Sequence, residues 1–361
     1  MTFKKAHLQR IPLAIIILLL VSCTGTEEKQ SQPANENEAR ILLSYLEENG
    51  DIINSAEIPF LINADEVHAN LNGSNYHVVD VRSPRDFNRG HIAHAVNIQP
   101  ENILDYFENR IEPNSFQKIT IVCNDAHLSG YVAGILRFLG YDNVFNMRFG
   151  MSAWHDDIAR RHWYANISDD LVGRLETTPH PKNEPGPLPN LSTGKNTGYE
   201  ILRERAQIAL ELDYHSTVID FMDILEGKED YYLVNYWPEA LYNQGHLPGA
   251  IQYDPKKAFH SGADIFTLPT DQPLVVYCYS GHHTVYVNAY LALLGYEFRS
   301  LDYGVNAFTH QIMAETQPAS RSFSAIHVRN YPLVRDGLLD MSDSRNEPAE
   351  KVEVTTVQGG C

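Results

Sequence analysis

The chain has 361 residues, which is long enough for two domains with separate cores. Its hydrophobic content of 43% and charged content of 20% are those of a folded globular protein. The formal net charge of −18 argues against nucleic acid as a partner and against docking on anionic lipid by charge, and any anionic substrate would need a local positive pocket.

Residues 1–22 have the features of an export signal. Basic residues precede the apolar run 11–21, which is too short for a comfortable membrane span. The run ends in Leu20-Val-Ser-Cys23, which resembles the cleavage box of bacterial lipoproteins, where the cysteine is acylated and becomes the mature N-terminus. This resemblance implies a lipid anchor at Cys23 that holds the protein in the bacterial cell envelope, facing the periplasm. An ordinary signal peptide or an uncleaved anchor is the alternative.

Residues 23–56 combine a polar tether with a first helix. The tether is low in apolar residues, as flexible linkers are. From Ala39 to Glu48 the apolar residues recur at helical spacing and predict an amphipathic helix. A similar pattern from Tyr199 to Leu212 predicts a second helix of this kind.

Residues 57–165 predict a first α/β domain. Val78 to Val81 and Ile119 to Val122 are β-branched runs typical of buried strands, and a helical stretch at Asp86 to Arg89 lies between them. Asn63 is placed to cap a helix. Strands that alternate with helices indicate a parallel sheet with helices on both faces.

The remaining chain divides into three predicted segments. Residues 166–212 are a linker, rich in proline between 177 and 197, followed by the second predicted helix, and we expect this length to leave room for domain mobility. Residues 213–330 form a second domain. Residues 331–361 are a C-terminal segment that ends in a flexible Gly-Gly-Cys361 tail.

Two cysteines mark a duplication. Cys123 and Cys278 lie 155 residues apart, and each ends a β-branched run and is followed, seventeen residues later, by a Gly-Tyr pair. A helical pattern begins at Thr284, which is suited to capping. Cys278 therefore lies between a strand end and a helix N-terminus, where loop NH groups and the helix dipole lower a thiol pKa. This is a position suited to a nucleophile.

The elements upstream of each cysteine are also repeated. The first copy has Val79-Asp80-Val-Arg82 and Gly90-His91-Ile, and the second has Gly245-His246-Leu in the equivalent place. This ordered set, with the cysteine loop and the Gly-Tyr pair, resembles the rhodanese family. The resemblance implies an α/β fold of two rhodanese-like domains, each a parallel β-sheet flanked by helices on both faces, and a sulfurtransferase that needs no cofactor.

In the family, the cysteine thiolate takes the outer sulfur of a donor such as thiosulfate, holds it as a persulfide and passes it to a thiol. The resemblance therefore implies Cys278 as the catalytic residue, a small sulfur-containing anion as donor and a thiol as acceptor. The family loop is Cys-x-x-Gly-x-Arg-Ser/Thr. The second copy has His283 in place of the arginine, and we expect it to donate hydrogen bonds and to be partly charged near neutral pH. The implied substrate-binding residues are Tyr279, Ser280, Gly281, His282, His283 and Thr284.

The first copy departs further from the family loop. Ala126 replaces the glycine and Leu128 the arginine, and the carboxylate of Asp125 should oppose both a thiolate and an anionic donor. Two roles remain open for the first copy: it is either a second active site or a structural or docking domain. Asp80 and Arg82 predict a salt bridge at the strand end. The possible second site comprises Cys123, Asn124, Asp125, Ala126, His127, Leu128 and Ser129.

Four further points concern the C-terminal cysteine, metals and other functions. The Gly-Gly-Cys361 terminus resembles the swinging arm of periplasmic sulfur-carrier proteins, so Cys361 could accept sulfur from Cys278. No metal is expected, because the four cysteines have no ligand spacing and the adjacent His282 and His283 have no third ligand in their motif. A related phosphatase and arsenate-reductase branch is disfavoured, because Thr284 stands where its arginine would fall. A non-catalytic sulfur-binding or scaffold lipoprotein is the alternative to an enzyme.

Overall fold

The computed structural model describes residues 2, 37–335 and 338–340. The predicted signal peptide, Cys23, most of the tether and Cys361 lie outside these residues, so the hypotheses about them remain predictions. No helix in the described ranges is long and apolar enough to cross a membrane.

The first domain contains a five-stranded parallel sheet in the order β1-β5-β4-β2-β3. Its strands are β1 (Leu61–Ile62), β2 (Tyr76–Asp80), β3 (Val96–Asn97), β4 (Lys118–Val122) and β5 (Val144–Met147). Its helices are α2 (Ala64–Asn70), α3 (Pro84–Arg89), α4 (Ile103–Asn109), α5 (His127–Phe138), α6 (Met151–Trp154) and α7 (Asp156–Arg161). Short 3-10 turns lie at Ile52–Asn54, Pro100–Asn102 and Pro113–Ser115.

The second domain contains a four-stranded parallel sheet in the order β7-β6-β8-β9. Its strands are β6 (Tyr232–Asn235), β7 (Ile251–Gln252), β8 (Leu274–Tyr277) and β9 (Phe298–Ser300). Its helices are α9 (Phe221–Leu225), α10 (Glu239–Tyr242), α11 (Thr284–Leu294) and α12 (Asn306–Thr316), with 3-10 turns at Tyr214–Thr217, Ile265–Thr267, Ala319–Arg321 and Ala325–His327. The chain then forms an antiparallel pair, β10 (Leu333–Arg335) and β11 (Leu338–Asp340). The expected fold of two α/β domains is confirmed.

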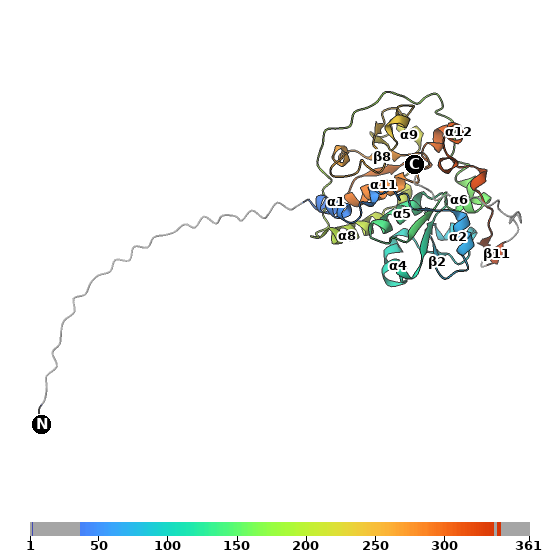
Figure 1. Ribbon diagram of the computed structural model, residues 1–361, viewed down its shortest axis with the longest axis horizontal. Coiled ribbons are helices and arrows are strands. Elements are labelled where there is room, and N and C mark those ends of the chain that lie inside the picture. Colours follow the sequence, from blue (N-terminus) through green and yellow to red (C-terminus); the bar gives the residue numbers. More distant parts are fainter. Residues whose placement is uncertain (1, 3–36, 336–337, 341–361) are drawn as a thin grey trace. The chain divides into compact units, whose positions relative to one another are not determined.

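Strand side chains alternate between two cores in each domain, because successive residues of a strand point to opposite faces. In β2, Val79 belongs to a central core that also contains Val234 and Val276 of the second sheet, whereas Val78 faces an outer core with Val67 of α2. The central core lies between the two sheets and includes α5 and α11, which Figure 1 shows near the middle of the domain pair. The two domains thus share one hydrophobic core.

Part of the linker packs on this shared core, and its expected mobility stays a prediction. Its buried Leu188 joins the central core. The carboxylate of Glu38 accepts hydrogen bonds from the NH groups of Thr193 and Gly194, at 2.7 and 3.0 Å. Both predicted leading helices are present, as α1 (Glu38–Glu48) and α8 (Gly198–Glu211), and they pack against each other. Sequence composition could not show this, because these contacts join segments far apart in the chain.

The equivalent helices α5 and α11 pack closely through glycine. A Cβ atom at Gly130 would overlap a methyl group of Val285 and lie 2.8 Å from Nδ2 of Asn146. A Cβ atom at Gly134 would lie 3.1 Å from Cβ of Ala289, which is crowded but tolerable with a small shift. Gly130 therefore sets how closely the two domains approach.

We expect Gly130→Ala to lower the free energy of unfolding by ~1–3 kcal/mol, the usual cost of overpacking a core. Gly134→Ala is the matched control on the same helix and should stay within ~1 kcal/mol of the wild type, because its better helix propensity offsets mild crowding. Urea unfolding midpoints of the three proteins measure this. Equal midpoints for the two variants would contradict the tight contact at Gly130.

Candidate active site

The two cysteines occupy equivalent turns at the carboxyl ends of the central strands. Cys123 follows β4 and precedes α5, and Cys278 follows β8 and precedes α11. A second turn closes over each: the NH groups of Met151 and Val305 donate to the carbonyl oxygens of Cys123 and Cys278, at 2.8 and 3.0 Å. Each cysteine is thus held between a strand end and a covering turn.

The covering turns require glycine. Gly150 and Gly304 have φ angles of +60° and +54°, in the left-handed region that other residues rarely adopt. A Cβ atom at Gly150 would lie 2.5 Å from the carbonyl oxygen of Cys123, and one at Gly304 would overlap that of Cys278. The two copies therefore share one backbone geometry around the sulfur.

The two loops meet each other through equivalent histidines. The rings of His127 and His282 stack with centroids 6.0 Å apart and planes 18° apart. Nε2 of His282 accepts from the NH of Phe149, at 3.2 Å, and Nε2 of His127 lies 3.1 Å from the NH of Tyr303. Each histidine thus reaches the covering turn of the other domain, across an approximate two-fold relation.

The loop of Cys278 is buried in the structure. The side chain of Cys278 is 0% exposed, and all six predicted substrate-binding residues are buried as well. A Cβ atom at Gly281 would lie only 2.6 Å from Nε2 of His127, so the first domain fills the space beside the loop. A sulfur donor reaches this thiol only if side chains move.

Two expectations about this loop are wrong. Burial, and to a lesser extent the charge of Lys256, lower the pKa of His283 to about 3, so the imidazole is neutral and supplies no charge for an anion. Its ring stands edge-on to Tyr236, with centroids 5.0 Å apart. The helix N-cap is His283 and not Thr284, whose hydroxyl donates to the carbonyl of Gly281 at 3.1 Å. Burial by distant segments, which the motif does not encode, explains the first correction.

The thiol of Cys123 is held by the carboxylate that the sequence places beside it. Its Sγ donates to Oδ1 of Asp125 at 3.3 Å and accepts from the NH of Ser129 at 3.3 Å. Burial, and then the charge of Asp125, raise the pKa of the Cys123 thiol. The expected opposition between Asp125 and a thiolate is confirmed, and Cys123 is a protonated thiol at neutral pH.

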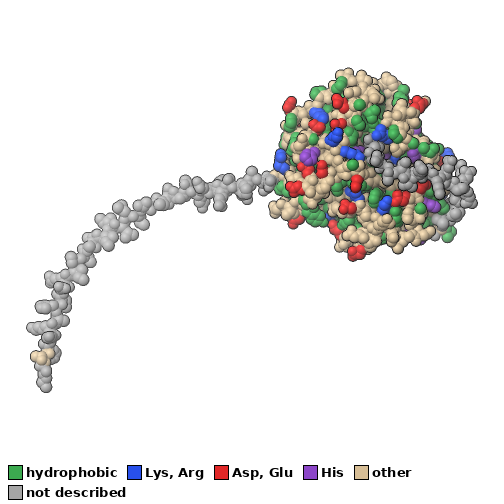
Figure 2. Space-filling view, viewed as in Figure 1, with side chains coloured by type: hydrophobic (Ala, Val, Ile, Leu, Met, Phe, Trp, Pro, Cys, Tyr) green, Lys and Arg blue, Asp and Glu red, His purple; other side chains and the backbone are tan. Residues whose placement is uncertain are grey.

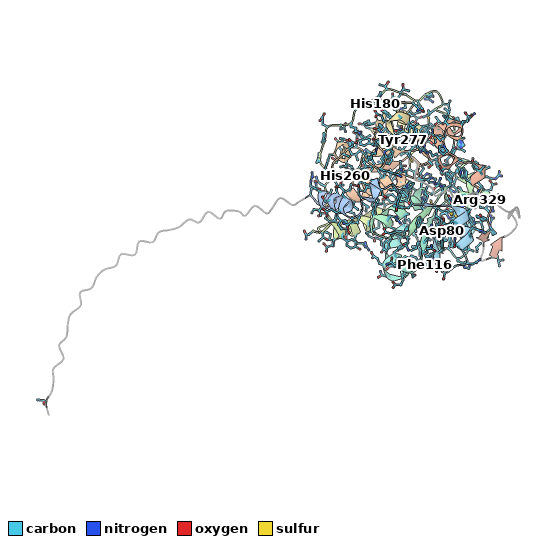
Figure 3. All side chains as sticks on the ribbon, in the orientation of Figure 1. Asp80, Phe116, His180, His260, Tyr277 and Arg329 are labelled. Carbon is cyan, nitrogen blue, oxygen red and sulfur yellow. The ribbon has the colours of Figure 1, made fainter. Side chains whose placement is uncertain are left out.

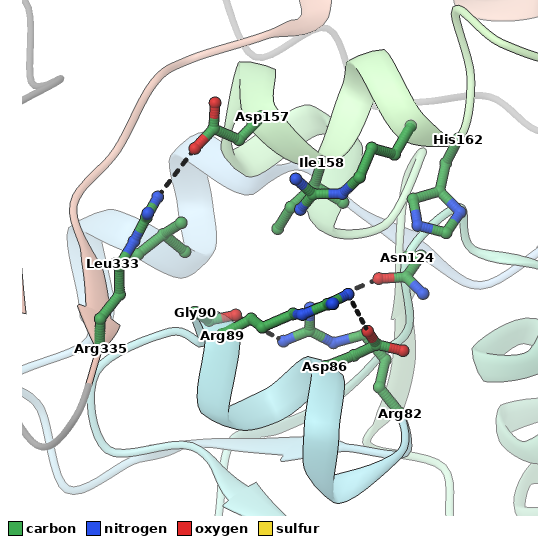
Figure 4. A pocket seen from close by; sticks show the side chains of 11 residues that line it. Arg82, Asp86, Arg89, Gly90, Asn124, Asp157, Ile158, His162, Leu333 and Arg335 are labelled. Atoms are coloured by element: carbon green, nitrogen blue, oxygen red, sulfur yellow. Dashed lines mark hydrogen bonds and ion pairs between the residues drawn. The ribbon is translucent and has the colours of Figure 1, made fainter.

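The predicted salt bridge of the first copy is present and borders a cavity. Nη2 of Arg82 lies 2.6 Å from Oδ2 of the buried Asp80, which Figure 3 labels near the lower part of the domain pair. Next to Arg82 is a cavity of about 370 Å³ whose wall includes Asn124, the neighbour of Cys123. Figure 4 shows its side chains and the ion pair between Arg335 and Asp157. Four arginines line it: Arg82, Arg89, Arg161 and Arg335.

Two carboxylates, Asp86 and Asp157, also line the cavity and pair with Arg89 and Arg335, so the lining keeps a net positive charge that an anion would need. On the face in Figure 2, acidic and basic side chains are interspersed. Sequence reasoning missed the cavity, because its arginines come from four separate segments. Only Arg82 carried a signal, through its place in the strand-end motif.

The second copy has aromatic rings in the corresponding place. Trp237 and Tyr279 stand 155 residues after Arg82 and Asn124 and stack with centroids 4.8 Å apart. The guanidinium of Arg321 lies 4.3 Å from the centroid of the Tyr279 ring. These three residues are called the aromatic stack below; Trp237 and Tyr279 are buried, whereas Asn124 of the first copy borders the cavity.

Comparison with known proteins identifies the class. The model of the rhodanese-like domain matches residues 63–157 and again 213–311, more than half of the chain. The chain therefore belongs to the rhodanese-like family and carries two tandem domains.

Individual relatives cover one domain or both. The chain is similar to the thiosulfate sulfurtransferase GlpE of Shewanella oneidensis, with 32% identity over 79 residues, which span 22% of this chain and 75% of the relative. A solved rhodanese-related protein from Thermoplasma volcanium is 28% identical over 26% of this chain and 87% of that one, with a TM-score of 0.23. A thiosulfate sulfurtransferase from Pseudomonas aeruginosa is 15% identical over 80% and 73% of the two chains, with a TM-score of 0.26.

Removing the carboxylate beside Cys123 should make the thiol of Cys123 easier to deprotonate. We expect Asp125→Asn to lower the apparent pKa of Cys123 by ~1 unit or more, because a like charge near a thiol disfavours the thiolate. The pH dependence of iodoacetamide labelling, resolved by peptide mapping, measures the change. Asp86→Asn, which alters a cavity carboxylate that bonds Ser83, is the matched control. An unchanged labelling profile at Cys123 would refute the role of Asp125.

The buried His127 should make stability depend on pH. Burial alone would lower its pKa, but the carboxylates of Asp302 and Asp125 outweigh burial and raise the pKa to about 9. Because the ordinary value is near 6.5, the charged imidazole stabilises the fold fully below about pH 6.5, and this contribution is lost as the pH rises through about 9. We expect a loss on the order of 3 kcal/mol between pH 6.5 and 10. Urea midpoints across this range should fall further in the wild type than in His127→Gln, and parallel falls would contradict the assignment.

Proposed function

We propose that this protein is a sulfurtransferase that carries sulfane sulfur on Cys278. The observation that carries the proposal is the difference between the two loops: Ser280 stands where the first copy has the carboxylate of Asp125, whereas Gly281 and Ala126 take the same turn, with φ angles of +80° and +81°. The sequence similarity to a thiosulfate sulfurtransferase supports the reaction class.

The proposed reaction has two displacements. The thiolate of Cys278 attacks the outer sulfur of thiosulfate, the sulfur–sulfur bond breaks, and sulfite leaves with the electron pair, so that a persulfide remains on the enzyme. A thiolate acceptor, small molecule or protein, then attacks the outer sulfur of the persulfide and regenerates the Cys278 thiolate. A polysulfide donor reacts in the same way and releases a shorter polysulfide.

Access to Cys278 requires the aromatic stack to open. Because Trp237 and Tyr279 are buried against each other, a donor enters only when the pair separates. Arg321 lies on the stack and is the cation that we assign to the entering anion, since the neutral His283 cannot take the place of the family arginine.

The first domain is a second candidate site, favoured by its arginine cavity. The cavity supplies the charge and room that an anionic donor needs, next to the loop of Cys123. Its thiol is held protonated, so sulfur loading there requires Asp125 to be displaced or neutralised. A sulfur-binding or scaffold role without turnover is the alternative, and the burial of both thiols favours it.

We also propose a role for each end of the chain. Residues 1–23 support a lipid anchor at Cys23 in the bacterial cell envelope, with the folded domains facing the periplasm. The Gly-Gly-Cys361 terminus supports a relay in which Cys361 takes sulfur from Cys278. Intact mass of the mature N-terminus tests the anchor.

Sulfur loading distinguishes these sites. After incubation with thiosulfate, and separately with a polysulfide, we expect the protein to gain the mass of one sulfur that peptide mapping places on Cys278. The gain should persist in Cys123→Ser and vanish in Cys278→Ser, and mapping of Cys361 tests the relay. Trp237→Ala should speed loading roughly threefold to tenfold, because an aromatic pair is worth ~0.5–1.5 kcal/mol. If no thiol of a folded protein gains sulfur, the scaffold alternative holds instead.

A further inference from the structure

A cluster of side chains of the types that ligate metals lies outside the two cysteine loops. Glu176 and His180 belong to the segment between the domains, and His246 belongs to the turn after α10 of the second domain. Nε2 of His180 lies 2.6 Å, and Nε2 of His246 3.5 Å, from Oε1 of Glu176. Figure 3 labels His180 at the upper edge of the domain pair, beyond Tyr277 of β8. The three ligand atoms lie within 4.8 Å of one another.

The orientation of His246 is fixed by its own element. Its Nδ1 lies 2.8 Å from the carbonyl oxygen of Tyr242 and donates to it, and the ring stacks on that of Tyr242 with centroids 3.7 Å apart. This leaves Nε2 as the ring nitrogen that faces the carbonyl oxygen of Thr178, at 3.2 Å, and the carboxylate of Glu176, at 3.5 Å. His246 is 1% exposed, so a buried imidazole nitrogen and two oxygen atoms, all of them possible metal ligands, lie together.

The first copy shows that the fold does not need this cluster. Its equivalent His91 makes the same bond, from Nδ1 to the carbonyl of Phe87 at 2.9 Å, and the same ring stack at 3.7 Å. There the segment that pairs with the histidine contributes Val334, whereas in the second copy the pairing segment contributes Glu176. The carboxylate and the second histidine are therefore an addition to the second copy.

We propose that Glu176, His180 and His246 bind one Zn²⁺ ion. Two imidazoles and a carboxylate form a ligand set that zinc takes in proteins, with a fourth position left for water or for the carbonyl of Thr178. Ligand atoms of tetrahedral zinc lie about 3.3 Å apart, given metal–ligand distances of about 2.0–2.1 Å, so His246 and Glu176 already fit. His180 must withdraw by less than 1 Å, and its partly exposed ring has room to do so.

Groups around the ligands hold them in the orientation that a metal needs. The NH of Gly249 donates to Oε1 of Glu176 at 2.7 Å, and the carbonyl of Tyr242 fixes the ring of His246. Bound zinc would clamp residues 176–180 of the interdomain segment to the second domain. The sequence could not reveal this site, because His246 lies 66 residues after His180 and no ligand spacing relates them.

Zinc titration of the full-length metal-free chain against a chromophoric chelator tests the proposal. We expect one equivalent to bind in the wild type, and His180→Ala to bind at least ~100-fold more weakly, since even the partners of metal ligands contribute 10–100-fold in affinity. His215→Ala removes an exposed histidine elsewhere in the second domain and should leave affinity unchanged. Glu176→Gln, which keeps a carbonyl oxygen for Gly249, should weaken binding as well.

Two further measurements distinguish zinc bound at this site from zinc bound by the cysteine thiols. Cobalt in place of zinc should give the absorption bands of a tetrahedral nitrogen and oxygen site, without the charge-transfer bands of a thiolate. Zinc should also slow proteolysis near residues 176–186 in the wild type but not in His180→Ala. No binding by the wild type, equal affinity in His180→Ala and His215→Ala, or thiolate bands would each overturn the proposal.

Discussion

The contact between His127 and His282 joins the two domains at the position where a rhodanese domain places its cysteine. Each imidazole lies on its own cysteine loop and reaches the covering turn of the other domain, at Phe149 or Tyr303. Because the covering turns press against the cysteine carbonyls through Gly150 and Gly304, a shift of either histidine reaches both sulfur sites. The geometry of each thiol is thus fixed by both domains, and the shared core behind the loops prevents the domains from separating.

The two stacked histidines differ in charge: His127 is charged, whereas His282 is neutral. Nε2 of His127 lies 3.1 Å from both the NH of Tyr303 and the carbonyl of Ser280, so the neutral ring accepts from the first and the charged ring donates to the second. His282, by contrast, is kept neutral by burial and by the neighbouring charge of His127, since both lower its pKa. Two histidines at equivalent positions can therefore stack without mutual repulsion.

The sequence predicted those features that depend on nearby residues. The strands, the leading helices and the Asp80–Arg82 bridge follow from apolar periodicity or from groups two residues apart, and the effect of Asp125 on Cys123 follows from adjacency in one loop. The features that failed or were missed depend on burial by distant segments. His283 is neutral because segments far from its motif enclose it, and the arginine cavity collects side chains from positions as distant as Arg82 and Arg335. No local pattern encodes either result.

The segments that follow each domain connect the two sites in a reciprocal way. The segment after the first domain pairs with His246 of the second, and the segment after the second domain pairs with His91 of the first. Arg321, near the end of the second domain, lies over the ring of Tyr279 beside Cys278, and Arg335, in the segment that follows, lines the cavity beside Cys123. Arg321 and Arg335 are 14 residues apart, so one stretch of chain lies against the surroundings of both cysteine loops.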